Sequence, residues 1–484
     1  MLSSYKLNVL QFHFSDDEGW RLEIPGLEEL TTVGARRGHT TDEKDRLYPA
    51  YDGGYDPDAA ISGNGYYTRE EFIDLLRYAA ERHVRIIPEI ESPGHARAAI
   101  VAMKARYKKY VETEPEKAKE YLLSDLQDTS RYVSAQGYTD NVMNVALPST
   151  YRFMEKVIQE IVAMYKEAGV PLTTIHLGGD EVAKGAWMGS PLCRAFMQEQ
   201  RMEKAHDLAE YFITRVVDCL QQYNLSFNGW QEVALGHKAE THSYLSQRAG
   251  GINVWKTAAE GKEDGITPQI ANNGYPVILC NVNNFYLDLA YDAHPDEPGH
   301  FWAGYVDEAK AFSAGKGKTV LTAFGKHPIK GVQAQLFTET IRGFQWVEYY
   351  IFPKVMGLVE RGWNAHPEWA VLSGVQEQQA FDRDLSLFYE KISGKEMPFW
   401  DKMGMNFRLP PPGLFVKDGL LYANTSIKGA QVRYTTDGTE PTADAKLWEF
   451  PVTCRSAVVK AKLFYKDKQS VTAIICSHDC TAEE

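Results

Sequence analysis

The sequence lacks the features that mark membrane-spanning and nucleic-acid-binding proteins. In its 484 residues no apolar run is long enough to span a bilayer, and Met1 to Lys6 lacks the charged and apolar regions of a signal peptide. The 52 Lys and Arg residues are outnumbered by 65 Asp and Glu residues, and the formal net charge of -13 opposes binding to a phosphate backbone or an anionic membrane surface. We therefore expect no transmembrane segment and no nucleic-acid partner.

Cysteine is also scarce, and its six positions show no metal-ligand or redox spacing. Cys476 and Cys480 are close enough in sequence to pair, but solitary thiols buried as small apolar residues are the alternative. The cysteines therefore say little about the compartment.

What the sequence does have, from Lys6 to about Trp363, is an alternation of short apolar runs with amphipathic segments, which is typical of βαβ units. Amphipathic segments at 68–83, 150–168 and 205–223 are predicted helices. A mostly helical stretch then leads to Phe407. The predicted strands are seven, at 7–12, 84–89, 173–177, 226–230, 251–255, 277–281 and 331–337. The pattern predicts an α/β fold, a (β/α)8 TIM-type barrel that is one strand short.

A second domain is predicted after residues 408–413, whose three prolines can neither continue a helix nor join a sheet interior. Beyond this linker the pattern changes to short strands, at 432–435, 457–465 and 470–475, with an Asp437-Gly438 turn. We expect a barrel domain over residues 1–407 and a small all-β sandwich over 414–484.

The most informative stretch is His176-Leu177-Gly178-Gly179-Asp180-Glu181, which sets two carboxylates side by side after a short predicted strand. The carboxyl ends of barrel strands are where such folds collect their active sites, so the pair favours acid/base chemistry. The same sequence could also have a purely structural role. It would then be a strand followed by a Gly-Gly turn, an Asp N-cap and a Glu in the first helical turn.

Polar residues also follow the first two predicted strands. Asp16 and Asp17 come after the first, where a sugar-binding role competes with a structural role in the loop. His95 follows the second, in a segment fixed by prolines and a glycine, and can orient a neighbouring carboxylate. Metal ligation by His95 is disfavoured because no His or Cys partner stands at a ligand spacing.

Aromatic residues stand at or beyond the later strand ends, where they either pack in the core or stack on a sugar. Trp230 and Trp255 end two successive predicted strands, which suggests the walls of a pocket. Tyr286 and Asp288 share a side if their stretch is extended, and the same alternation would aim Phe337 and Glu339 inward.

Taken together, these segments resemble glycoside hydrolase family 20, the β-N-acetylhexosaminidases, from Lys6 to about Trp363. His176 to Glu181 matches that family's His-x-Gly-Gly-Asp-Glu signature. The segment from Lys6 to Arg21, Pro93-Gly94-His95, Tyr286-Leu287-Asp288 and Trp302 to Val306 match in the same order. The last module resembles the small β-sandwich often appended to bacterial members.

The resemblance implies an exo-acting, retaining hydrolase that removes terminal β-linked GlcNAc or GalNAc from a glycan by substrate-assisted catalysis. The substrate's acetamido oxygen would attack the anomeric carbon, and water would later open the oxazolinium formed. Glu181 would protonate the leaving oxygen and activate that water, while Asp180 would hold the acetamido N–H. Tyr286 would donate to the acetamido oxygen. No metal or organic cofactor is implied.

The resemblance also assigns the remaining site residues. His95 would steady the acidic pair, and Trp230, Trp255 and Phe337 would enclose the acetamido group and the sugar ring. The residues expected to bind the sugar hydroxyls are Asp288, Trp302 and Glu339.

Two departures from the family pattern affect what is expected of this chain. Phe337 stands where the family usually has tryptophan, which makes one wall of the pocket smaller. The second departure is that we do not find the family's first strand, its sugar-binding arginine or the preceding α/β domain. We therefore expect that the full-length protein is an exported, active enzyme and that this shorter chain is impaired. The alternatives are a non-catalytic carbohydrate-binding protein and an inactive fragment.

Overall fold

The computed structural model describes residues 1–51, 54, 61–256, 265–315, 329–456 and 458–476. These residues form two compact units. The first holds the described residues up to 279 together with 329–331, and the second holds 280–315 and those from 332 onwards. Each unit is described by itself. In the described part of the chain no helix is both long enough and apolar enough to cross a bilayer.

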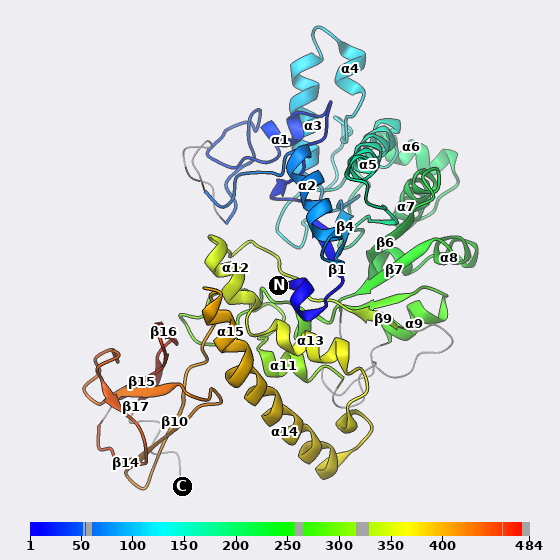
Figure 1. Cartoon of the computed structure of the whole chain (residues 1–484). Helices are drawn as coiled ribbons and strands as arrows, with labels where there is room; N and C mark the ends of the chain where they lie inside the picture. Colours follow the sequence, from blue (N-terminus) through cyan, green and yellow to red (C-terminus); the bar gives the residue numbers. More distant parts are fainter. Residues whose placement is uncertain (52–53, 55–60, 257–264, 316–328, 457, 477–484) are drawn as a thin grey trace. The chain divides into compact units, whose positions relative to one another are not determined.

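The first unit is built on a curled, seven-stranded sheet whose strands follow one another in chain order (Figure 1). The first six pair in parallel, and β9 follows β8 at the edge. The strands are β1 (Val9–His13), β4 (Arg85–Glu89), β5 (Thr174–His176), β6 (Ser226–Trp230), β7 (Ala249–Val254), β8 (Val277–Leu279) and β9 (Ile329–Val332). The prediction of a TIM-type parallel fold is confirmed, with seven strands among the described residues.

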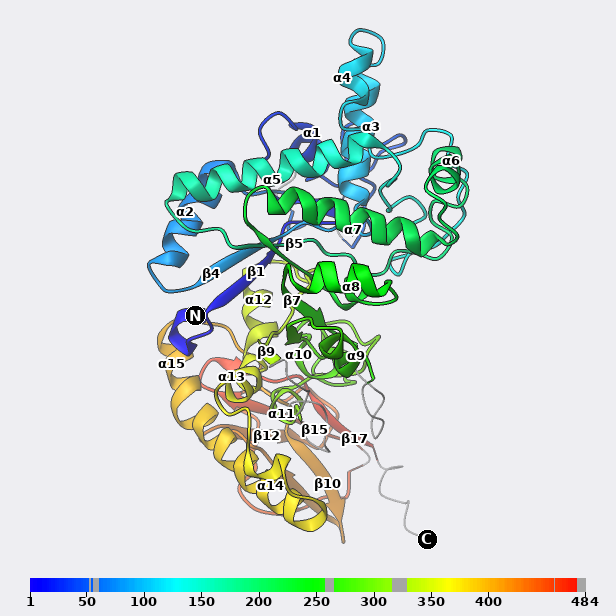
Figure 2. The same ribbon diagram turned by 90° about the vertical axis from the view of Figure 1, so that its right-hand side faces the viewer.

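Helices pack on the outer face of this sheet, and α5 and α7 lie side by side in Figure 2. Helix α2 begins with a capping box, in which the Thr68 hydroxyl accepts from the backbone N–H of Glu71 and the Glu71 carboxylate accepts from that of Thr68. The elements around the sheet are η1 (Leu2–Tyr5), β2 (Ser15–Asp16), β3 (Gly19–Trp20), α1 (Glu29–Thr32), α2 (Arg69–Ala80), α3 (Arg97–Tyr110), α4 (Pro115–Lys119), α5 (Pro148–Ala168), α6 (Pro191–Glu199), α7 (Ala205–Gln221), η2 (Gln231–Ala234), α8 (Ala239–Ser246) and α9 (Ile266–Asn272). All three predicted helices are present.

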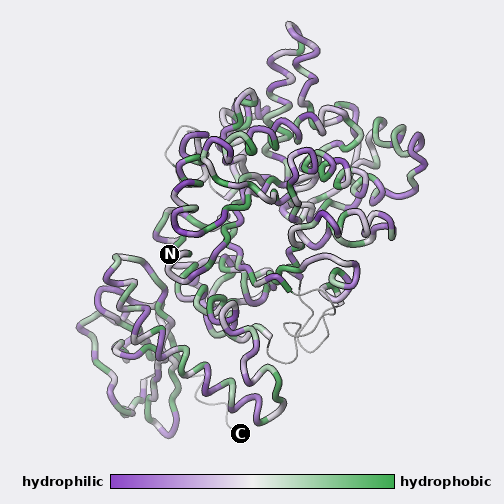
Figure 3. Tube along the Cα trace, turned by 45° about the vertical axis from the view of Figure 1, so that its right-hand side comes forward, coloured by the Kyte–Doolittle hydropathy of each residue, from purple (hydrophilic) through white to green (hydrophobic). Residues whose placement is uncertain are grey.

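Large aromatic side chains fill the space between the sheet and its helices. The ring of Phe14, just after β1, meets that of Phe72 on α2 edge to face at 5.0 Å, and Trp20 meets Phe153 on α5 at 5.9 Å. Figure 3 shows hydrophilic and hydrophobic residues alternating along the helical turns, as expected where one face is buried and the other solvated. This core fixes the strand ends that carry the site.

The second unit begins with irregular chain and short helices and ends in antiparallel sheets. Its helical elements are α10 (Val282–Phe285), α11 (Glu308–Phe312), α12 (Phe344–Ile351), α13 (Val355–Trp363), η4 (Glu368–Ala370), α14 (Gly374–Lys391), the π-helical η5 (Ile392–Glu396) and α15 (Met397–Lys402). The last helices match the predicted helical stretch before Phe407. The proposed linker, 408–413, lies inside this unit, and its role as a domain boundary stays a prediction.

The C-terminal strands form two antiparallel sheets, one of β10, β11 and β14 and one in the order β13, β12, β15 and β16 with β17 also on β15. Inward and outward residues alternate along β15, which is typical of a sheet with one buried face. The strands are β10 (Gly413–Lys417), β11 (Leu420–Asn424), β12 (Gln431–Thr435), β13 (Lys446–Leu447), β14 (Val452–Thr453), β15 (Val458–Tyr465), β16 (Lys468–Gln469) and β17 (Ala473–Cys476). The all-β prediction is confirmed; Cys480 lies outside the described residues.

The predicted end of the last barrel strand is wrong. The strand was expected to run over 331–337, but β9 ends at Val332 and Gln335 makes only a single bridge, to Tyr286. Apolar residues go on alternating with Gln333 and Gln335 past the regular hydrogen bonding here, so the alternation alone does not locate the end of the strand. Phe337 and Glu339 therefore stand on irregular backbone.

Candidate active site

Polar residues stand at adjacent register positions on four neighbouring strands. His13 on β1 stands beside Glu89 on β4, Glu89 beside His176 on β5, and His176 beside Asn228 on β6. The two oxygens of Glu89 lie 3.0 Å from His13 Nδ1 and 3.0 Å from His176 Nδ1. Burial opposes ionisation of Glu89, but the charges of His176 and His13 outweigh it and hold its pKa well below the ordinary value.

The acidic pair stands just beyond β5 on a strained turn. Gly178, Gly179 and Glu181 all have left-handed backbone, with φ of 67°, 94° and 46°. A side chain at Gly178 would meet the Glu91 carboxyl group at 1.9 Å, and one at Gly179 would meet Val233 at 2.1 Å. Both glycines are thus required by conformation and by space. A left-handed glutamate is uncommon, and such strain concentrates at functional positions.

The alternative interpretation of Asp180 as a helix N-cap is wrong. No helix begins at Asp180 or Glu181; the next is α6, which starts at Pro191 and has Ser190 as its capping residue. The two carboxylates are therefore available to the open end of the sheet, where the side chains of Asp180 and Glu181 are 18% and 30% exposed.

His95 lies between two pairs of acids. Its Nδ1 is 3.3 Å from Asp16 and 3.5 Å from Asp17, and its Nε2 is 3.6 Å from Asp180 and 3.5 Å from Glu181. Burial disfavours the charged ring, but the charges of Asp180 and Asp16 outweigh it and raise the pKa of His95 well above its ordinary value. Asp16 and Asp17 thereby orient the ring that faces the acidic pair, which is a structural role tied to the site.

Burial, together with the nearby carboxylates of Glu232 and Glu181, raises the pKa of Asp180 to about 6, against an opposing contribution from His95. Burial and the charge of Asp180 raise the pKa of Glu91 well above its ordinary value. This shift favours the neutral form of Glu91 beside Asp180, and Trp230 donates its indole N–H to Glu91 at 3.1 Å. A carboxyl group, a carboxylate and an indole thus form one connected group.

The two predicted tryptophans of the first unit are buried but not in a purely apolar core. Trp230 is 3% exposed and meets the ring of His176 edge to face at 5.1 Å. Trp255 is 7% exposed and donates its indole N–H to Glu232 at 3.3 Å. Both indoles are therefore anchored to carboxyl groups at the polar end of the sheet.

The other predicted residues gather in the second unit. The ring of Tyr286 lies 5.6 Å from that of Phe337 and 6.1 Å from that of Trp302. The backbone N–H of Phe337 donates to Asp288 at 3.4 Å. Burial, with a smaller contribution from the charge of Glu339, raises the pKa of Asp288 to about 7. The five residues named from the sequence for this part of the chain thus form one group.

A buried lysine, Lys354, holds the backbone on either side of Asp288 in this second group. Lys354 is fully buried, and its ammonium donates to the carbonyls of Leu287 at 2.8 Å and Leu289 at 2.5 Å, on either side of Asp288. Burial lowers the pKa of Lys354 to about 7. His300, 3.8 Å from Glu339, also belongs to this group, and the nearby Glu339 carboxylate raises the pKa of its ring.

Sequence analysis did not identify the residues that contact and orient the predicted site residues. For His13, Glu89 and His176 a signal was present, because they end otherwise apolar strands at adjacent register positions, an unusual place for polar side chains unless they face a site. The missed residues are His13, Glu89, Glu91, His176, Glu232, His300 and Lys354.

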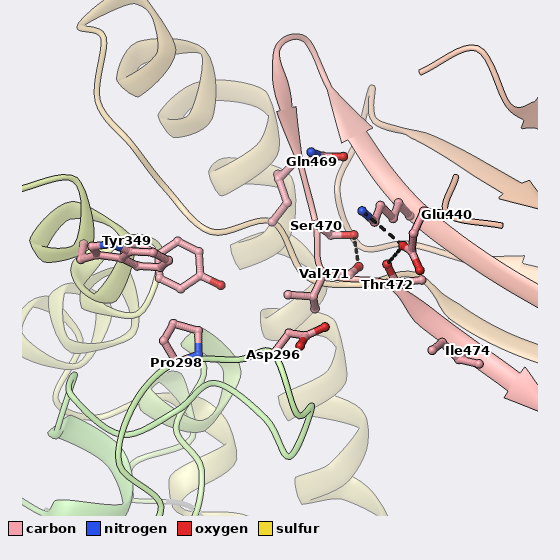
Figure 4. A pocket seen from close by; sticks show the side chains of 12 residues that line it. Asp296, Pro298, Tyr349, Glu440, Gln469, Ser470, Val471, Thr472 and Ile474 are labelled. Carbon is pink, nitrogen blue, oxygen red and sulfur yellow. Dashed lines mark hydrogen bonds and ion pairs between the residues drawn. The ribbon is translucent and has the colours of Figure 1, made fainter. Parts of the chain in front are cut away.

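The cavity in Figure 4 lies in the second unit and is separate from these residues. It has a volume of about 360 Å³ and is lined by segments 296–298 and 346–349, by Leu409 and by strands of the C-terminal sheet. The Glu440 carboxylate in its lining is already paired, since it accepts from Thr472 at 2.6 Å and lies 3.5 Å from Lys462. None of the candidate site residues lines it.

Comparison with known proteins identifies both parts of the chain. Residues 1–366 match the model of the glycosyl hydrolase family 20 catalytic domain, and residues 396–471 match that of the chitobiase/beta-hexosaminidase C-terminal domain. A beta-hexosaminidase of Vibrio vulnificus is 37% identical over 90% of this chain and 55% of its own length. An N,N'-diacetylchitobiase of Vibrio harveyi is 32% identical over the same shares.

A solved structure gives the same result. The family 20 exo-β-N-acetylglucosaminidase of Vibrio harveyi, in complex with N-acetylglucosamine, superposes with a TM-score of 0.67 and 31% identity, over 84% of this chain and 55% of that one. The chain thus spans about half the length of the curated relatives it matches.

Proposed function

Because the chain belongs to glycosyl hydrolase family 20, we propose that it is an exo-acting, retaining β-N-acetylhexosaminidase that removes terminal β-linked GlcNAc or GalNAc from glycans. The observation that carries the proposal is the strained turn at Gly178 to Glu181, which presents two carboxylates of unequal exposure against His95. Two carboxylates that are adjacent in sequence do not suit a conventional retaining enzyme, in which an acid and a nucleophile face each other about 5 Å apart across the bond. They suit a reaction whose nucleophile is part of the substrate.

In the proposed mechanism Glu181, the more exposed of the two, is the general acid that protonates the glycosidic oxygen and the base that then activates water. Asp180 accepts the N–H of the 2-acetamido group. As the acetamido oxygen attacks the anomeric carbon, positive charge develops on the ring formed, and the Asp180 carboxylate stabilises it in a pre-formed, partly desolvated site. His95 keeps the two carboxylates apart and oriented.

Tyr286 donates to the acetamido oxygen, and Trp230, Trp255 and Phe337 enclose the acetamido group. Asp288, Trp302 and Glu339 bind the hydroxyls at the non-reducing end, which excludes further sugar residues and makes the action exo. We propose that the reaction uses no metal or organic cofactor and that the protein has no nucleic-acid partner, and export stays a prediction.

Glu181→Gln tests the proposal by hydrolysis of 4-nitrophenyl N-acetyl-β-glucosaminide. We expect kcat to fall at least about a hundredfold, the scale of general acid catalysis, while the affinity for N-acetylglucosamine is largely kept. Glu199→Gln is the matched control, since it removes an exposed carboxylate at the end of α6. The readout is the ratio of variant to unmodified rate, so the test does not depend on the absolute activity of the chain.

The alternatives give different results in the same assay. A sugar-binding protein without activity would bind N-acetylglucosamine and show no turnover to lose. A conventional two-carboxylate glycosidase would also cleave the 4-nitrophenyl β-glucoside, which has no acetamido group. Substrate assistance requires that the glucoside is not cleaved.

A further inference from the structure

A cluster of histidines and a glutamate lies in the first unit, outside the acidic site. His206 and Glu210 are one turn apart on α7 and so share a face of that helix. His237 comes from the segment between η2 and α8, which lies beside α7 (Figure 2). One potential ligand atom from each of the three side chains lies within 4.8 Å of the other two.

The hydrogen bonds of His237 fix which of its nitrogens carries a proton. Its Nε2 lies 2.8 Å from the carbonyl oxygen of Val233, and a carbonyl can only accept, so Nε2 is the donor. In the neutral ring Nδ1 then has a bare lone pair, and it faces the Glu210 carboxylate at 3.3 Å. Two acceptors that face each other repel unless a positive charge lies between them.

A proton on Nδ1 is one such charge, and a bound metal ion is another. The His237 side chain is only 2% exposed, so water screens the two facing groups little. His242 itself is occupied, since its two nitrogens lie 3.2 Å from the Tyr275 hydroxyl and 3.4 Å from the Asn273 amide.

We propose that His206, Glu210 and His237 form a binding site for a divalent transition-metal ion such as Zn²⁺. Two imidazoles and one carboxylate are a ligand set that suits zinc, and a fourth position remains for water. The hydrogen bond from His237 to Val233 is the kind of outer contact that orients a ligating histidine. Glu210 is likewise held, by the Thr241 hydroxyl at 2.5 Å and more weakly by the Lys238 N–H at 3.4 Å.

The ion would cross-link two segments that are distant in sequence. It would tie α7 to the chain that follows η2, and η2 is the element directly after Trp230 at the end of β6. Binding would therefore stabilise the turn that carries one wall of the acidic site. Exposed His206 gives the ion access from solvent.

Calorimetric titration of tag-free, chelator-treated protein with ZnCl2 tests the proposal. We expect saturable binding that raises the melting temperature, and in His206→Gln an affinity at least about tenfold lower, since losing a ligand costs no less than losing an outer contact. His206 is exposed, so the substitution leaves the fold intact, and His366→Gln, also exposed, is the control that keeps full affinity.

Cobalt gives a second readout, because Co²⁺ in a site with histidine ligands absorbs visible light, and His206→Gln should lose that absorption. Three results would overturn the proposal: no saturable Zn²⁺ binding, equal affinity in His206→Gln and unmodified protein, or Mg²⁺ binding as tight as that of Zn²⁺, since imidazole is a poor magnesium ligand. Each is independent of whether the protein hydrolyses glycosides.

Discussion

Replacing Gly178 with alanine should cost much more stability than the same change at Gly169, although the two glycines have nearly the same backbone. Their φ angles are 67° and 71°. A side chain at Gly169, which ends α5, meets nothing within 4 Å, whereas one at Gly178 would lie 1.9 Å from the Glu91 carboxyl group. The pair of variants therefore separates backbone strain from loss of space.

The magnitudes follow from these contacts. A left-handed alanine costs about 1–2 kcal/mol, and this is all that Gly169→Ala should lose. Gly178→Ala should lose the same amount and, because Glu91 must leave its hydrogen bond with Trp230, about a further 1–3 kcal/mol. It should also lose most of the hydrolytic activity, since the turn carries both carboxylates.

Urea unfolding followed by tryptophan fluorescence measures the difference, and the aryl glycoside assay measures the activity. Gly169→Ala should keep its activity under conditions where it is folded. Equal unfolding midpoints for the two variants, or full activity in Gly178→Ala, would refute the argument that glycine is required at position 178 because Glu91 occupies the space of a side chain.

Two further predictions concern the charged groups of the site. Because the pKa of Asp180 is raised to about 6, the carboxylate that holds the acetamido group is lost below that pH, so kcat/KM should fall on the acidic side with a midpoint near pH 6. Asp180→Asn should lack that limb of the pH profile, and an unchanged limb would contradict the assignment. Lys354→Met should raise KM more than it lowers kcat, because Lys354 positions the irregular segment around Asp288, whereas Lys395→Met, at a side chain 82% exposed, should change neither. A fall in melting temperature without any change in KM would show that Lys354 is only structural.

The sequence predicted the sheet well because burial leaves a simple pattern. The strand at 226–230 matches β6, and the helix at 205–223 differs from α7 by two residues at one end, since a long amphipathic period is hard to mistake. The end of β9 could not be located in this way, because Ala334 and Leu336 continue an alternation of polar and apolar residues beyond the hydrogen-bonded strand.

Only part of the candidate site could be predicted from the sequence. The residues proposed to touch substrate could be named, whereas those that act through other residues could not. Residues proposed to touch substrate, such as Glu181 and Tyr286, stand in short segments that resemble a family and could be named one by one. Residues that act through others, such as Glu91 and Lys354, matter only through contacts between distant segments. Glu91 meets Trp230 across 139 positions, and no local pattern shows such a contact.

The direct test of the mechanism is the dependence of rate on the leaving group in Glu181→Gln and Asp180→Asn. A general acid is dispensable when the leaving group needs no proton, whereas the group that holds the substrate's own nucleophile is needed for any leaving group. We predict that 2,4-dinitrophenyl N-acetyl-β-glucosaminide restores the first step in Glu181→Gln but not in Asp180→Asn. Restoration in both variants, or in Asp180→Asn alone, would contradict the roles assigned to the two carboxylates.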